Sequence, residues 1–234
     1  MSFNAPKSMA EQIAQHLANQ IISGQRVEHE RIQELKVVDE LDVSRGSVRE
    51  ALLLMERRHL VDIVPRRGAM VAEISADSVE NLFDVFGVLV TRLAVLVAQR
   101  WQNNELDSLI QHLVLLQSIA EQKDREEFMA QVFRLLTMAY PLARNEYLHE
   151  VLVNMQPAVH RCYALAQRYK PNDGQAALVF FSALMTGVTK REVEGSNEYL
   201  ANSKKYGKDM AQADGNVKYL SKRHREAKEA HSWD

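Results

Sequence analysis

The sequence predicts a mainly α-helical protein, with an N-terminal winged helix-turn-helix followed by a C-terminal antiparallel α-helical bundle. Two observations support this prediction. Residues 1–75 contain three short amphipathic segments and then two β-prone runs that flank a basic turn. The remaining residues form a series of long helical patterns separated by short polar breaks. Low aromatic content (7%) and only five prolines suit such a chain.

The first two helices have recognisable start or stop signals. Ser8 and Glu11 match a capping box, in which a serine hydroxyl and a glutamate carboxylate bond to each other's backbone amides. Apolar residues then recur at helical spacing as far as Gly24, a natural C-terminal glycine. A second short helix fits residues 34–41. Its apolar residues are expected to face inward: Leu35, Val38 and Leu41.

The third helix carries the strongest functional signal. Ser44 is a good N-cap, and Arg45 and Arg49 follow one turn apart on the same face. Two guanidinium groups at the start of a short helix suit the phosphates and guanine edges of a DNA major groove. An amphipathic surface helix with scattered arginines is the alternative. The opposite face is apolar and should pack on a small core: Val48, Ala51, Leu52 and Met55.

A basic hairpin is expected after the third helix. The β-prone runs 60–64 and 69–74 flank Pro65-Arg66-Arg67-Gly68, where glycine can adopt a positive φ. The whole chain has a net charge of −2, but the segment from Arg45 to Arg67 holds six arginines against three acidic residues. DNA binding requires a basic face rather than a basic protein.

These residues resemble the DNA-binding domain of the GntR family of bacterial transcription regulators. The similarity rests on Val43-Ser44-Arg45 with Val48-Arg49-Glu50-Ala51-Leu52, then on Leu60-Val61 and Arg67-Gly68. An all-helical remainder of this length implies the FadR-like branch, whose effector domain is called FCD. The resemblance implies that Arg45 and Arg49 contact DNA and that Gly68 enters the minor groove.

The resemblance also implies several supporting DNA contacts. Ser44 and Ser47 are expected on phosphates. Some relatives carry a basic contact at the start of the second helix; that position is Leu35 here, and neighbouring Lys36 could replace it. The complete expected set of DNA-binding residues is Ser44, Arg45, Ser47, Arg49, Arg66, Arg67, Gly68 and Lys36.

Residues 76–220 are expected to form the effector-binding and dimerisation domain, and residues 221–234 a charged, solvated tail. The first helix of this domain is apolar on several faces, which predicts burial by neighbours on several sides. The short breaks predict antiparallel neighbours. We expect six helices, at residues 77–101, 104–121, 124–140, 145–169, 174–193 and 196–213.

The expected bundle lacks the metal ligands of its apparent relatives. Many FCD domains bind a metal through one Asp and three His, and those positions fall here near Ala130, Arg134, Phe181 and Ser203. Only His149 and His160 lie near each other on one expected helix, and eleven residues separate them by about 16 Å. We therefore expect no metal and no cofactor.

The resemblance further implies an apolar effector pocket. The branch usually carries an Arg–Glu pair on the first bundle helix, where this chain has Phe86 and Val90. Loss of that arginine disfavours small organic acids and suits an acyl chain, or a packed core without a ligand. The expected lining residues are Phe86, Val90, Phe133, Arg134, Tyr140, His160, Tyr163 and Phe181.

Other functional classes find little support in the sequence. It contains no nucleophile-elbow motif, phosphate-binding glycine loop or metal motif, so we do not expect an enzyme. The single cysteine, Cys162, excludes an intramolecular disulfide framework and suits a reducing cytoplasm. No signal peptide is evident, and we expect no membrane span.

We therefore expect a cytoplasmic, homodimeric transcription regulator, acting as a repressor on a palindromic operator in double-stranded DNA. A small-molecule effector, apolar or acyl-type, would modulate its affinity for the operator. Two alternatives remain open. One is a regulator without small-molecule sensing that acts through a protein partner. The other is a helical interaction module whose winged helix docks protein rather than DNA.

Overall fold

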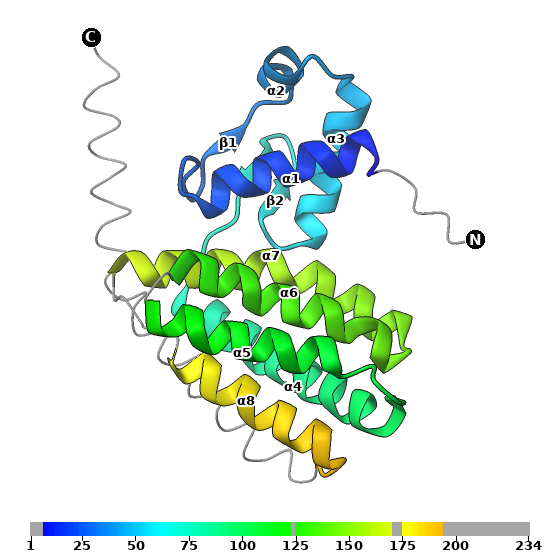
Figure 1. Cartoon of the computed structure of the whole chain (residues 1–234). Helices are drawn as coiled ribbons and strands as arrows, with labels where there is room; N and C mark the ends of the chain where they lie inside the picture. Colours follow the sequence, from blue (N-terminus) through cyan, green and yellow to red (C-terminus); the bar gives the residue numbers. More distant parts are fainter. Residues whose placement is uncertain (1–6, 123–124, 170–174, 194–234) are drawn as a thin grey trace. The chain divides into compact units, whose positions relative to one another are not determined.

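The computed structural model describes residues 7–122, 125–169 and 175–193, and these fall into two compact units, with the boundary along the chain between Ile74 and Ser75 (Figure 1). Three features expected from the sequence lie outside the described residues: the helix at 196–213, the charged tail at 221–234, and Ser203.

The first unit has the winged helix-turn-helix order. Its helices are α1 (Met9–Ile22), α2 (Glu34–Leu41) and α3 (Arg45–Arg57), and α3 packs against both α1 and α2. Its strands are β1 (Arg31–Ile32), β2 (Val61–Val64) and β3 (Gly68–Val71). They form an antiparallel sheet in the order β1-β3-β2. The sequence did not predict β1, because two residues are too few to show a strand period.

The expected helix caps are present. The amide of Glu11 donates to the Ser8 hydroxyl (3.2 Å), and the Ser8 amide donates to the Glu11 carboxylate (2.7 Å), which confirms the capping box. Ser44 caps α3 by accepting from the amide of Ser47 (3.1 Å). These side chains satisfy amides that have no partner within a helix.

The core of the first unit lies between α1, α3 and the sheet, and it corrects one sequence prediction. Val37 of α2 is buried, with 1% of its surface exposed, whereas Leu35 is 61% exposed. The expectation that Leu35 faces inward was wrong. Val37, Val38 and Leu41 form the inner stripe of α2, and Leu35, two residues before Val37, points to the other side of the helix.

The second unit is a bundle of long helices. Its described members are α4 (Ala76–Arg100), α5 (Asp107–Gln122), α6 (Arg125–Ala143), α7 (Glu146–Tyr169) and α8 (Gln175–Lys190). Helix α4 packs against α6, α7 and α8, while α5 packs against α6 and α8 (Figure 1). This central place explains why α4 is apolar on several faces.

Helix α4 is also long and apolar enough, by length and composition alone, to cross a membrane. From the sequence alone we expect no membrane span. In the structure, 56% of its most apolar window is buried within the unit. A buried core helix passes the same test, so this property is weak evidence for a membrane span.

Side chains from distant segments join the ends of these helices. Arg191, just after α8, donates to the carbonyl oxygens of Ala98 (2.7 Å) and Trp101 (2.8 Å), at the end of α4. Its guanidinium lies 4.1 Å from the centre of the Trp101 ring, and the indole N–H donates to the Val188 carbonyl (3.2 Å). The end of α4 is therefore tied to the end of α8.

Candidate nucleic-acid interface and bundle cavity

Two arginines in the first turns of α3, Arg45 and Arg49, project from the first unit and share one carboxylate. The side chains of Arg45 and Arg49 are 57% and 60% exposed. The Nε–H of each donates to the same oxygen, Oε2 of Glu34, at 3.1 Å from Arg45 and 3.0 Å from Arg49. Glu34 is the first residue of α2, where the helix dipole also favours a negative charge. The arrangement links the starts of α2 and α3.

The protonation of Glu34 follows from these contacts. Partial burial alone would raise the pKa of its carboxyl, but the hydrogen bonds and positive charges of Arg45 and Arg49 outweigh burial and lower the pKa below its ordinary value. A lowered pKa means that the stability from these ion pairs is present above the ordinary value and is lost as the pH falls through the lowered one. The pairs therefore persist at neutral pH.

The polar residues expected around these arginines lie nearby in the chain. The hydroxyl groups of Ser44 and Ser47 are 2.9 Å apart, and Ser44 also caps α3. Lys36 is exposed on α2. The capping role of Ser44 does not depend on DNA.

The expected hairpin tip is exposed and tightly turned. The amide of Arg67 donates to the Val64 carbonyl (3.0 Å), and φ is +66° at Arg66 and +81° at Gly68. Arg66, Arg67 and Gly68 are all exposed. The hairpin therefore presents two cations, Arg66 and Arg67, beside the glycine that begins β3.

The structure adds a third cation beside this glycine. Arg31 of β1 pairs opposite Met70 of β3. A Cβ placed on Gly68 would lie 3.9 Å from both Nε and Nη2 of Arg31. The guanidinium of Arg31 therefore lies alongside the backbone of the wing.

Sequence reasoning missed both Glu34 and Arg31. Glu34 lies eleven and fifteen residues before its two partners, so the contact depends on how α2 packs on α3. Arg31 reaches the wing only through the pairing of β1 with β3. One sequence signal could have found them: each is a charged residue at the start of a secondary-structure element.

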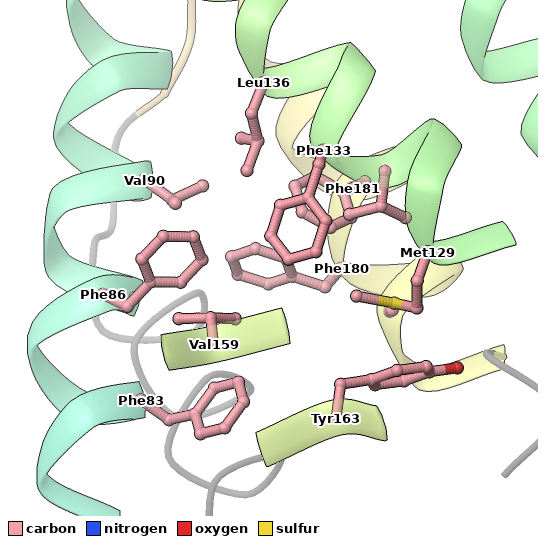
Figure 2. A pocket seen from close by; sticks show the side chains of 13 residues that line it. Phe83, Phe86, Val90, Met129, Phe133, Leu136, Val159, Tyr163, Phe180 and Phe181 are labelled. Atoms are coloured by element: carbon pink, nitrogen blue, oxygen red, sulfur yellow. The ribbon is translucent and has the colours of Figure 1, made fainter. Parts of the chain in front are cut away.

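An apolar cavity of about 60 Å³ lies inside the helical unit. Helix α4 contributes Phe83, Phe86, Gly87 and Val90, a repeat of three and four residues that forms one face. Figure 2 shows phenylalanine side chains from α4, α6 and α8 around this space, with the Tyr163 hydroxyl pointing away from the rings of α4. The other lining residues are Met129, Val132, Phe133, Leu136, Val159, Tyr163, Ala177, Phe180 and Phe181.

Five of the eight residues expected to line a pocket do line this cavity: Phe86, Val90, Phe133, Tyr163 and Phe181. The other three do not. Arg134 is exposed, because the inner stripe of α6 follows its neighbour Phe133. Tyr140 is buried further along α6, where its hydroxyl accepts from Gln156 (2.8 Å) and burial raises its pKa. The ring of His160 packs outside the lining, with its centre 5.2 Å from that of Phe133.

A second apolar cavity, of about 40 Å³, adjoins the first. Val90, Leu136 and Phe181 line both, so the two form one elongated apolar region. Charged side chains are absent from the lining of either cavity in the described part of the chain. This region suits an apolar occupant better than an ionic one.

Within residues 7–122, 125–169 and 175–193, no group of three or more His, Cys, Asp or Glu side chains is arranged to hold a metal ion. His149, one of the two histidines considered from sequence, stacks on Tyr140 with a ring separation of 4.7 Å.

Comparison with known proteins identifies relatives of this architecture. Residues 9–71 match the family model described as bacterial regulatory proteins, gntR family. A search of curated proteins finds no significant match. Similar solved structures include McbR/YncC of Escherichia coli, at 19% identity and a TM-score of 0.63, covering 94% of this chain and 100% of that one.

Two other solved structures are similar over most of their length. A transcriptional regulator GntR from Rhodococcus sp. RHA1 has 20% identity and a TM-score of 0.64, covering 89% of this chain and 99% of that one. Lar of Listeria monocytogenes has 17% identity and a TM-score of 0.53, with the same coverage. At these identities the likeness concerns the fold.

Proposed function

We propose a cytoplasmic, homodimeric repressor whose operator affinity depends on a ligand in the helical unit. The premise is that residues 9–71 match the gntR family of bacterial regulatory proteins. The coarser function, a DNA-binding transcriptional regulator, follows from the family. We assign the chain no catalytic role.

One observation carries the proposal. Arg45 and Arg49 are more than half exposed on the first turns of α3, and they are held side by side by Glu34. In helix-turn-helix proteins the N-terminal residues of this second helix contact base edges in the major groove. An arginine pair in this place can bind guanine edges or phosphates through its terminal nitrogens.

The remaining proposed DNA contacts are of two kinds: those made by the wing and those made to DNA phosphates. Gly68 allows the hairpin backbone to approach a minor groove, and its neighbours bring positive charge to that approach. We assign the wing contacts to Arg66, Arg67 and the structurally adjacent Arg31. Phosphate contacts are assigned to Ser44, Ser47 and Lys36.

A two-fold dimer would present two such surfaces to DNA. Because an isologous dimer has two identical halves, its operator should be a palindrome whose half-site spacing follows the protein symmetry.

The ligand proposal rests on the chemistry of the bundle cavity. Its lining is aromatic and aliphatic, which favours an apolar or acyl-type molecule. Its volume of about 60 Å³ is well below the roughly 150 Å³ of an engineered cavity that binds benzene. Binding therefore requires the lining rings to move apart. A ligand that prefers this opened form would shift the protein between two states, which is how it could act on DNA binding.

The test of DNA recognition begins with selection of bound duplexes from a random pool by the full-length protein. We expect a palindromic consensus, and an affinity that falls steeply with salt as counterions are released. Arg49→Ala should weaken binding to the consensus about 5- to 150-fold, equivalent to about 1–3 kcal/mol. Arg92→Ala, at an exposed arginine of α4, is the matched control.

Two results would count against this function. Enrichment of no sequence, with weak binding to every duplex, would favour the interaction-module alternative. Consensus binding that survives Arg49→Ala would remove α3 from the interface.

A further inference from the structure

Glu34 places a carboxylate where the proposed function needs positive charge. Its Oε2 lies 3.1 Å from Nε of Arg45 and 3.0 Å from Nε of Arg49, the two residues assigned to base edges. A negative charge beside DNA phosphates opposes binding. Electrostatics alone would therefore favour a neutral residue here, so the carboxylate calls for another explanation.

The geometry of the contact supplies one. Glu34 accepts from the Nε–H of each arginine and leaves the terminal nitrogens to other partners. A guanidinium has five N–H donors, and four of them are on its two terminal nitrogens. The end-on fork that binds guanine O6 and N7 uses those terminal groups. Glu34 therefore restrains both side chains without occupying the atoms that would contact a base.

We propose that Glu34 is a specificity-determining positioning residue, which fixes Arg45 and Arg49 for base recognition while lowering the affinity for DNA of any sequence. The inference rests on the proposed function. A free arginine can turn toward whichever phosphate is nearest, whereas a restrained one retains its full set of contacts only where the base edge fits. Ordering before binding also reduces the entropy lost at the specific site.

The lowered pKa of the Glu34 carboxyl agrees with this role, because the residue keeps its charge at the pH of a binding experiment. Its position at the start of α2 contributes as well, since a helix N-terminus favours a carboxylate. The restraint thus joins α2 and α3, the two helices of the helix-turn-helix, at the residues that the proposal assigns to recognition.

Two substitutions of Glu34 separate position from charge. Glu34→Gln removes the charge and weakens the hold on both arginines. Glu34→Asp keeps the charge but withdraws the carboxylate by one methylene, so that it no longer reaches both Nε atoms. Glu40→Gln, at an exposed position of the same helix, removes one charge without touching either arginine in the described structure and serves as the matched control.

The experiment measures the affinity of each full-length variant for the selected consensus duplex and for a scrambled duplex of equal length, over a series of salt concentrations. We expect Glu34→Gln to bind the scrambled duplex several-fold more tightly, with a steeper salt dependence, and the consensus no more tightly than the wild type does. The specificity ratio should fall about tenfold. Glu34→Asp should lose specificity without gaining affinity for scrambled DNA. Thermal unfolding by circular dichroism checks that each variant folds.

Each other outcome overturns the inference. Equal gains on both duplexes, matched by Glu40→Gln, would mean that Glu34 acts only through its charge. Parallel losses on both duplexes that follow a lower Tm would mean a structural tie between helices. A wild-type protein that does not discriminate between duplexes would refute the proposed function itself, whereas discrimination unchanged in both Glu34 variants would refute the positioning role alone.

Discussion

At the scale of single residues, two glycines near the proposed interface have opposite structural requirements. Gly68 has φ of +81°, a region that side chains with a Cβ rarely adopt. Gly46 lies in the first turn of α3, where an added Cβ would meet the Ser44 hydroxyl oxygen at an ordinary 3.7 Å. A side chain is therefore disfavoured at Gly68 by the backbone conformation and not by lack of space, whereas neither disfavours one at Gly46.

We predict that Gly68→Ala destabilises the first unit by about 1–2 kcal/mol, because alanine is strained at positive φ. Gly46→Ala should instead stabilise it by up to about 1 kcal/mol, because alanine loses less backbone entropy than glycine in a helix. Urea unfolding of both full-length variants would measure the difference. Equal effects would show that the wing does not need its glycine.

Arg31 gives a second prediction at this scale. Its guanidinium lies beside Gly68, so DNA that approaches the wing would meet it. We expect Arg31→Ala to weaken binding to consensus and scrambled duplexes alike, and to reduce the slope of log affinity against log salt by about 0.9 if one phosphate contact is lost. Fluorescence anisotropy over a salt series measures both. An unchanged slope would remove Arg31 from the interface.

At the scale of secondary-structure elements, a sequence prediction was correct where the pattern behind it involves only residues that are close in the chain. The capping residues Ser8 and Ser44 each precede a helix as their sequence context indicates, because a cap involves only the next three residues. Strand β1 escaped prediction since only its pairing with β3 defines it. The inward direction of Leu35 was wrong because an eight-residue helix offers little more than two turns from which to judge a face.

The proposed DNA-binding surface shows the same difference between local patterns and contacts made by distant segments. Arg45, Arg49 and the hairpin could be predicted because their chemistry follows from spacing within one element. Glu34 and Arg31 could not, since their partners lie on other elements. In the bundle, the apolar stripes of α4 and α6 were partly anticipated, but Arg134 was assigned to the cavity on resemblance although it lies one residue beyond the inner stripe.

The tie between α4 and α8 yields an element-scale prediction. Arg191 donates to two carbonyl oxygens at the end of α4 and stacks on Trp101. We expect Arg191→Ala to destabilise the helical unit by about 1–3 kcal/mol, because two acceptors lose charged donors and a cation–π contact disappears. Arg191→Lys should retain only part of the stability that Arg191 provides, since an ammonium group lacks the planar fork of a guanidinium.

Urea unfolding followed by tryptophan fluorescence would report this change, because Trp101 is itself part of the contact. Arg92→Ala should change stability by less than about 0.5 kcal/mol, as expected for an exposed residue. A similar loss in both variants would mean that the effect is one of general charge and not of the tie.

At the scale of the whole molecule, regulation requires the ligand and the operator to affect one another. If an apolar ligand changes operator affinity by some factor, the operator must change the affinity for the ligand by the same factor. The cavity in the helical unit is smaller than such a ligand, so under this proposal a ligand-bound state would differ from the structure of Figure 1. The energy available for regulation is the preference of the ligand for that opened state.

The coupling between ligand and operator can be tested with a ligand and a variant chosen from the lining of the elongated apolar region. With no charged side chain in its described lining, dodecanol should bind more tightly than dodecanoate, because the carboxylate would lose hydration without gaining a partner. Val90 lines both cavities, so Val90→Phe should reduce the space in each and abolish the effect of dodecanol on operator affinity. Calorimetry would measure the affinity for dodecanol with and without operator DNA, and the affinity for operator DNA with and without dodecanol. The two ratios should be equal. Dodecanol binding that persists in a folded Val90→Phe variant would place the ligand elsewhere, whereas binding lost together with the coupling would locate the sensor in this cavity.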